Sequence, residues 1–415
     1  MTYYVSPTGS DTNAGTQSAP WKTLQYAASQ AQTGSLVLVA NGTYAGFHSV
    51  HAGTATAPIV FKAQGTQVIV NSRNANTLDN INIENTNYVA VDGFIVKDAA
   101  RGGIRVALAK GVVIQNNTVG PCQKWCIFTA FAPEIQIVHN TAFNATEQHG
   151  IYVSNSNTST DNPIIRGNVT YGNTRSGIQV NGDCYSEGNL DGVISGAVIE
   201  NNVIYENTAK GMSLISMQDS VVRNNVIYDN KGGAGAIHLT DEPGCGKPSS
   251  RNVVVYNTIV ESALAGIRIN DGATSNVVFN NLVIVTNPNK PLIKDETGGN
   301  LISTSNLTFT EIPTNLFVNS TLKNFHLMTN SPAQDKGEAS YQGKDAPTLD
   351  LEGTTRPQGT GSEVGGYEYT VGNATSTGSS SSSSSTTGSS SSSGGSTTSS
   401  GSTGSSTTSS PNSTP

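Results

Sequence analysis

The sequence predicts an all-β solenoid, in which short parallel strands stack coil upon coil, and three observations predict it. Only 12% of the 415 residues are charged and 44 are Gly, while Asn, Thr, Ser and Val dominate, which favours strands separated by tight polar turns. A four-residue strand pattern recurs along the chain, and an Asn recurs at the end of a second strand. A coil of this kind can bury its apolar face only against its neighbours, so the repeats indicate stacked coils.

The first repeat has the form Gly-Ile-x-Val. Its copies are Gly103–Val106, Gly150–Val153, Gly177–Val180, Gly211–Leu214 and Gly266–Ile269, with looser copies at Trp125–Phe128 and Ala236–Leu239. Alternate side chains of a strand point to opposite faces, so the two apolar residues face inward and the residue between them faces outward. The predicted outward column is Arg105, Ile127, Tyr152, Gln179, Ser213, His238 and Arg268.

The second repeat is an apolar strand that ends in Asn. These Asn residues are 23 to 34 positions apart, at 117, 140, 168, 202, 225, 257 and 281. Asn tolerates the left-handed backbone of a tight corner, and stacked Asn amides can form a ladder at the strand spacing of roughly 4.8 Å. A third short strand follows each Asn, as at Val203–Tyr205, which gives three strands per coil.

Longer coils carry insertions beside the Gly-Ile-x-Val strand, at residues 155–163, 184–192 and 242–250. Loops that lengthen on one side of a solenoid usually shape a binding site.

Both ends of the chain carry further motifs. They are Tyr3–Asp11 and Ala19–Leu24 at the start, and Phe325–Leu327, Ser331–Ala333, Asp350, Gly353, Arg356-Pro357 and Gly365–Glu368 at the end. With the repeats, these motifs resemble the secreted right-handed parallel β-helix proteins of the pectate- and alginate-lyase type, over about residues 3–370. The resemblance implies a right-handed three-sheet parallel β-helix with an N-terminal cap helix at about residues 24–32 and a closing segment over the last coil. Members of this group include lyases, glycoside hydrolases and uronate epimerases, so the fold alone does not select the chemistry.

Composition divides the chain into a β-helix domain, residues 1–371, and a Ser/Thr/Gly-rich disordered tail or linker, residues 372–415. No apolar run approaches the roughly 20 residues of a membrane span. We expect a secreted or cell-surface monomer whose signal peptide has been removed, because the N-terminus has no basic region and no apolar run.

The four cysteines, Cys122, Cys126, Cys184 and Cys245, do not follow a zinc-site spacing. Cys184 and Cys245 both follow a strand of the same type and are the preferred disulfide.

The net charge of -7 argues against nucleic acid as a partner. We expect an extended acidic polysaccharide instead, attracted by a local cationic surface. Cleavage by β-elimination needs a base and a group that neutralises the uronate carboxylate. We predict Tyr152 or His149 as the base with Lys124 and Arg175 beside it, and no required cofactor. The predicted substrate-binding residues are Arg105, Trp125, Gln179, Lys210, His238 and Arg268.

Two other functions stay open. Asp183, Asp241, Glu242 and Asp271 follow strands of the same type, so paired carboxylates there could support hydrolysis or hold Ca²⁺. The chain is also compatible with a non-catalytic surface protein that binds carbohydrate. Each candidate residue has an ordinary alternative, since charged side chains are common on solvated strands and Asp is common in turns.

Overall fold

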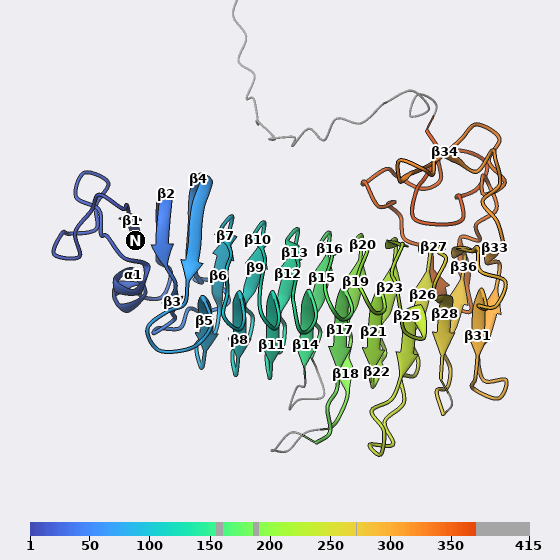
Figure 1. Ribbon diagram of the computed structural model, residues 1–415, viewed down its shortest axis with the longest axis horizontal. Helices are drawn as coiled ribbons and strands as arrows, with labels where there is room; N and C mark the ends of the chain where they lie inside the picture. Colours follow the sequence, from blue (N-terminus) through green and yellow to red (C-terminus); the bar gives the residue numbers. More distant parts are fainter. Residues whose placement is uncertain (155–160, 186–190, 271, 371–415) are drawn as a thin grey trace, which may run out of the picture. The chain divides into compact units, whose positions relative to one another are not determined.

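The computed structural model describes residues 1–154, 161–185, 191–270 and 272–370, and over these ranges the chain winds into stacked coils (Figure 1). The predicted tail at 372–415, and parts of two of the predicted insertions, lie outside the described residues. Within the described ranges, no helix is long and apolar enough to cross a membrane.

One face of the solenoid is a ten-stranded parallel sheet built from the Gly-Ile-x-Val repeats (Figure 1). Its strands are β3 (Phe47–His48), β5 (Ile81–Glu84), β8 (Ile104–Ala107), β11 (Ile127–Ala130), β14 (Ile151–Ser154), β17 (Ile178–Asn181), β21 (Met212–Ile215), β25 (Gly235–Thr240), β28 (Ala265–Ile269) and β31 (Ile293–Asp295).

The other two faces belong to one 21-stranded sheet, because β4 (Ile59–Ser72) pairs with the first strands of both. The strands β1 (Thr2–Val5) and β2 (Leu36–Ala45) precede β4 in this sheet, with β1 paired to β2 and β2 paired to β4. The second face consists of β6 (Val89–Asp92), β9 (Val113–Gln115), β12 (Gln136–Val138), β15 (Ile164–Arg166), β19 (Val198–Glu200), β23 (Val221–Arg223), β26 (Val253–Val255), β29 (Val277–Phe279) and β32 (Ile302–Thr304). The third face consists of β7 (Ile95–Val96), β10 (Thr118–Val119), β13 (Thr141–Phe143), β16 (Val169–Tyr171), β20 (Val203–Tyr205), β24 (Val226–Tyr228), β27 (Thr258–Glu261), β30 (Leu282–Val285) and β33 (Leu307–Phe309). A short parallel pair, β18 (Ile194–Ser195) and β22 (Met217–Gln218), lies outside these sheets.

The predicted Asn ladder is confirmed at the corner between the second and third faces. From Asn117 to Asn306, each side-chain Nδ2 donates to Oδ1 of the Asn one coil on, at 2.9 to 3.1 Å. The residue before the ladder position takes the left-handed conformation, as at Asn201 (φ 57°) and Asn224 (φ 54°). The ladder satisfies buried amides that would otherwise cost free energy, so it fixes the corner of each coil.

The N-terminal cap helix is confirmed as α1 (Leu24–Gln30), two residues shorter than predicted. Thr23 caps it by accepting a hydrogen bond from the Tyr26 amide, as Thr commonly does at this position. Leu24, Ala27 and Ala28 are buried, so the helix covers the apolar end of the first coil.

The closing segment packs on the flank of several coils rather than only on the last one. Its hairpin β34 (Phe317–Asn319) and β35 (Asn324–Leu327) shares an apolar cluster with Val226, Val260 and Leu282 on the third face. A second hairpin, β36 (Ser340–Tyr341) and β37 (Lys344–Asp345), lies beside the second face, where Tyr341 packs against Phe279.

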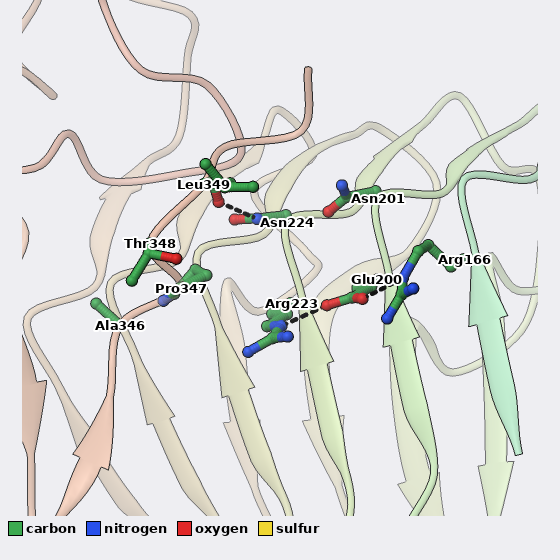
Figure 2. A pocket seen from close by; sticks show the side chains of 9 residues that line it. All are labelled: Arg166, Glu200, Asn201, Arg223, Asn224, Ala346, Pro347, Thr348 and Leu349. Atoms are coloured by element: carbon green, nitrogen blue, oxygen red, sulfur yellow. Dashed lines mark hydrogen bonds and ion pairs between the residues drawn. The ribbon is translucent and has the colours of Figure 1, made fainter. Parts of the chain in front are cut away.

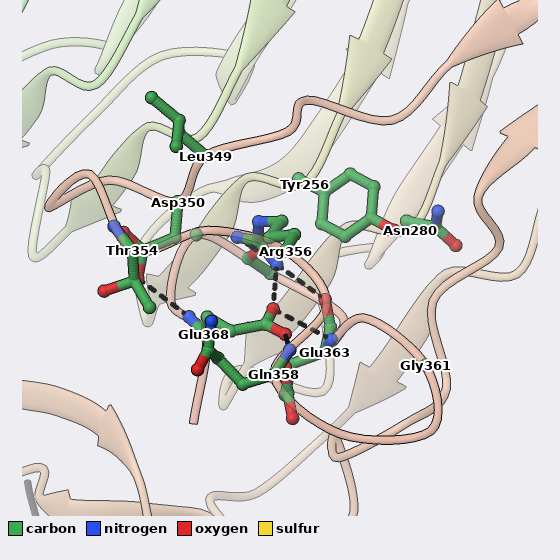
Figure 3. A network of polar contacts seen from close by, with 12 residues as sticks. Tyr256, Asn280, Leu349, Asp350, Thr354, Arg356, Gln358, Gly361, Glu363 and Glu368 are labelled. Atoms are coloured by element: carbon green, nitrogen blue, oxygen red, sulfur yellow. Dashed lines mark hydrogen bonds and ion pairs between the residues drawn. The ribbon is translucent and has the colours of Figure 1, made fainter. Parts of the chain in front are cut away.

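A buried polar network anchors this segment (Figure 3). The Arg356 guanidinium pairs with Glu368 at 3.0 Å, donates to the Gly365 carbonyl at 2.8 Å, and lies over the Tyr256 ring. Burial raises the pKa of the nearby Glu363 carboxyl to about 8.

The disulfide Cys184–Cys245 is confirmed, with the two Cα atoms 5.9 Å apart. It joins the segments that follow β17 and β25. Cys122 and Cys126 are buried and free.

Candidate functional site

The outward column of the ten-stranded sheet follows the predicted register except at β11. Phe128, not Ile127, pairs with Arg105 and Tyr152. Ile127 is fully buried, so its predicted outward position is wrong. The observed column is His48, Asn82, Arg105, Phe128, Tyr152, Gln179, Ser213, His238, Arg268 and Lys294.

At both ends of this column, glutamates neutralise the cations. Arg105 contacts Glu84 at 2.8 Å, and Arg268 forms two hydrogen bonds with Glu296, which Lys294 also contacts. These contacts lower the pKa of Glu296 to about 2. Neither glutamate was predicted from the sequence. Because each is paired with an arginine, Arg105 and Arg268 carry less uncompensated positive charge than the sequence indicated.

Three cations in the middle of the face keep their charge unpaired. Lys124, Arg175 and Lys210 form no ion pair with any described residue, and each lies just before its strand, at one edge of the sheet. Lys210 is partly buried, and its Nζ contacts Ser213 Oγ at 3.2 Å. Burial, and secondarily the charge of Arg268, lowers the pKa of Lys210.

An aromatic patch lies beside these cations. The Trp125 ring stacks on Phe128 with centroids 4.4 Å apart, and Phe128 meets the edge of Tyr152 at 5.4 Å. The looser copy of the repeat predicted at Trp125–Phe128 is one residue out of register, because the backbone pairing aligns Trp125 with His149, and Cys126 with Gly150. These aromatic rings give the ten-stranded sheet a surface on which a sugar ring can stack.

Two histidines of this face are held neutral by their surroundings. Burial and the nearby Arg175 lower the pKa of His149 to about 3, and its Nδ1 accepts the Ser176 amide proton at 3.1 Å. Burial and the nearby Lys210 lower the pKa of His238 to about 4, and its Nε2 contacts Asn270 Oδ1 at 2.8 Å. In this arrangement His149 presents Nε2–H, which makes it a hydrogen-bond donor rather than a free base.

The predicted carboxylates lie at the opposite edge of the sheet, after the strands. Asp183, Asp241 and Glu242 are each half-buried there, and Asp271 lies outside the described residues. Among the described residues, no group of three or more His, Cys, Asp or Glu is placed to hold a metal ion, and the calcium site stays a prediction. A four-residue strand separates the two edges, a distance of about 13 Å, so the cations and these carboxylates lie along different edges of the ten-stranded sheet.

A column of stacked tyrosines lies on the third face, away from the ten-stranded sheet. Tyr171, Tyr205 and Tyr228 stack at 5.0 Å, and Phe143 extends the column by one coil.

Comparison with known proteins identifies the family to which this architecture corresponds. The sequence matches the family described as right handed beta helix region over residues 39–191 and 161–322. A pectate lyase of Emericella nidulans is 44% identical over 71 residues, which are 16% of this chain and 17% of that protein. The chain thus spans only about a fifth of the length of the curated relatives that it matches.

Solved structures resemble the fold over nearly the whole solenoid. The pectate lyase Pel9A superimposes with a TM-score of 0.65 at 14% identity, covering 89% of this chain and 96% of that one. A rhamnogalacturonan lyase superimposes with a TM-score of 0.56 at 17% identity, covering 77% and 90%. At such identities the likeness shows the shared fold.

Proposed function

Because the chain belongs to the right-handed parallel β-helix family, we propose that it is a polysaccharide lyase acting on a uronate-containing polymer such as pectate or alginate. The observation that carries this proposal is the row of Lys124, Arg175 and Lys210, which have no carboxylate partner in the described chain and border the aromatic patch. The pectate lyases among its relatives and structural neighbours support the same class of reaction.

In β-elimination, a base removes the proton at C5 of a uronate. The electron pair forms the C4–C5 double bond, the C4–O bond breaks, and the leaving oxygen takes a proton. Negative charge builds up on the C6 carboxylate in the transition state, so fixed cations beside it lower the barrier. No water is consumed, and each cleavage makes one unsaturated end and one reducing end.

We assign the base to Lys210 first and to Tyr152 second. A lysine with a lowered pKa has a larger neutral, proton-accepting fraction near neutral pH, and Lys210 faces the outward column beside Ser213. Arg175, which precedes the strand next to that of Lys210, then neutralises the carboxylate of the reacting uronate. Lys124, three coils from Lys210, binds the carboxylate of another uronate along the polymer, and His149 donates a hydrogen bond from Nε2. Trp125, Phe128 and Gln179 bind neighbouring sugars.

We also propose that the protein is exported and acts as a monomer. The Cys184–Cys245 disulfide supports an oxidising compartment, since such bonds are rare in the cytosol.

A panel of polymers tests the proposal. The protein is incubated with pectate, alginate and the neutral polymer xylan, and ultraviolet absorbance of unsaturated ends is recorded with and without a chelator. We expect absorbance to rise with at least one acidic polymer and not with xylan. Absence of unsaturated products from every acidic polymer would reject the lyase assignment. Loss of activity in the presence of the chelator would indicate that the predicted calcium ion is required.

A further inference from the structure

A cavity of about 430 Å³ lies on the second face of the solenoid, away from the ten-stranded sheet (Figure 2). Its floor is formed by the ends of β15, β19 and β23 and the corners that follow β19 and β23. The segment 346–349, which follows β37, forms its other wall. Asn224 fixes this wall by donating from Nδ2 to the Leu349 carbonyl at 2.7 Å.

Two arginines in this cavity share one carboxylate. Arg166, Glu200 and Arg223 occupy the same register position on successive coils. Each arginine donates to Glu200 through Nε, and the terminal amino groups of both make no hydrogen bond to any described residue. Glu200 is buried, whereas the arginine side chains are 42% and 34% exposed, so their terminal groups face the cavity and solvent.

The lining therefore carries one net positive charge together with unused hydrogen-bond donors. A guanidinium presents a planar pair of donors that matches a carboxylate. The Oδ1 atoms of Asn201 and Asn224 have no donor among the described residues, but they have almost no accessible surface, so they do not face the cavity. The polar groups open to a ligand are the guanidinium donors.

The size of the cavity selects among possible anions. Its volume far exceeds the roughly 30 Å³ that one water occupies in the liquid, and it lies within the range of small-molecule sites. A simple inorganic anion would leave most of it empty. A short sugar with one carboxylate supplies an acceptor for the terminal amino groups of both arginines and also fills the remaining volume.

We propose that this cavity is a second carbohydrate site, which binds a mono- or disaccharide carrying a uronate carboxylate. The site is separate from the groove on the ten-stranded sheet, and the proposal holds whether or not that groove cleaves a polymer.

Isothermal titration of the full chain with digalacturonate tests the site. Arg223→Gln removes one guanidinium while Arg166 still compensates the buried Glu200, so the fold should survive. Thr348→Trp places bulk at an exposed position of the cavity wall and leaves both ion pairs intact. The matched control is Arg251→Gln, which breaks the exposed ion pair of Arg251 with Asp219 on the same face but outside the cavity.

We expect the digalacturonate affinity of the cavity to fall at least tenfold in Arg223→Gln and in Thr348→Trp, and to stay unchanged in Arg251→Gln. Digalacturonate binding that is the same in both cavity variants as in the parent protein, or that is lost only in Lys210→Ala on the ten-stranded sheet, would overturn the proposal. Inorganic phosphate that binds as tightly as digalacturonate and displaces it would show an anion site without sugar selectivity and would also overturn it.

Discussion

Lys210 combines partial burial, a neighbouring cation and the absence of a carboxylate partner among the described residues. Each of these either favours the neutral amine or leaves it free to react. The sequence analysis treated Lys210 as a binding residue, because neither burial nor the proximity of Arg268 can be read from a single strand copy. Tyr152 and His149 were easier to identify from the sequence, since they lie within or next to a clear Gly-Ile-x-Val repeat.

Lys210→Ala should lower kcat about 100-fold or more, the usual loss when a general base is removed. Lys210→Arg should be as inactive, because arginine keeps the positive charge but does not accept a proton near neutral pH. In the parent protein, kcat/KM should rise with pH through an apparent pKa below that of an ordinary lysine. Initial rates on the cleaved polymer between pH 6 and 10 measure this, with circular dichroism confirming the fold.

Lys124→Ala is the matched control. It removes a groove cation that we assign to substrate binding, so KM should rise more than kcat falls. Near-normal kcat in Lys210→Arg, together with inactivity of Tyr152→Phe, would move the base to Tyr152.

At the scale of the strand and its corner, the sequence predicted most of the fold, because the alternation of residues within each repeat indicates which side chains face inward and which face outward. The prediction failed at β11, where the motif Trp-Cys-Ile-Phe was read one residue out of register. A slip of one residue reverses every side chain of a strand. The outward Phe128 resembles a core residue, and it is stabilised outside by Trp125 and Tyr152, which the sequence analysis did not foresee.

The glutamates of the groove were missed for a related reason. Glu84 meets Arg105 and Glu296 meets Arg268 across neighbouring coils, 21 and 28 residues apart in the chain. No local pattern links such partners. The exact register between coils is therefore needed to know which cations remain unpaired.

The Asn ladder should be costly to interrupt. In Asn202→Ala, the backbone amide and Nδ2 of Asn168 lose their acceptor, and the Ile165 carbonyl loses its donor. Buried groups left without partners typically cost 1–3 kcal/mol each, so the free energy of unfolding should fall by about 3 kcal/mol. Urea unfolding measures this, with the exposed Gln136→Ala as the control. Equal stability of the two variants would contradict the structural role of the ladder.

A second ladder, Asn173, Asn207 and Asn230, ends on Glu261, whose carboxylate accepts from the Asn230 amide and side chain at 3.0 and 2.8 Å. Burial raises the pKa of Glu261 from 4.5 to about 8. The folded state therefore binds this proton more tightly than the unfolded state. The stability contributed by Glu261 is fully present below about pH 4.5 and is lost as pH rises through about 8.

Glu261→Gln should remove this loss, because glutamine does not ionise and its carbonyl oxygen can still accept the hydrogen bond from Asn230 Nδ2. The variant should gain on the order of 2 kcal/mol over the parent at pH 9 and little at pH 5. Urea unfolding at the two pH values checks the difference. An equal gain in the free energy of unfolding at both pH values would show that the pKa of Glu261 does not differ between the folded and unfolded states.

At the scale of the whole molecule, the disulfide joins the segments that follow β17 and β25, with β21 between these strands. Replacing both Cys184 and Cys245 with Ala should lower the free energy of unfolding by about 2–4 kcal/mol, since the unfolded chain loses a covalent loop. Tyr185→Phe is the control: it deletes only the hydrogen bond from the Tyr185 hydroxyl to the Pro243 carbonyl, between the same segments. Thermal unfolding compares the two, and a loss no larger than that of the control would contradict a stabilising role of the disulfide.

Across the ten-stranded sheet, cations without a carboxylate partner among the described residues lie along one edge, carboxylates lie along the other, and ion pairs lie at both ends. This arrangement favours a polymer whose carboxylates meet the cationic edge. High salt should weaken substrate binding, since it screens exposed charges.

The central claim is elimination, and the ratio of unsaturated ends to new reducing ends during cleavage of an acidic polymer tests it most directly. The account predicts one unsaturated end for each new reducing end from the first minutes onward, and neither in Lys210→Ala. New reducing ends without unsaturation would contradict elimination and indicate hydrolysis.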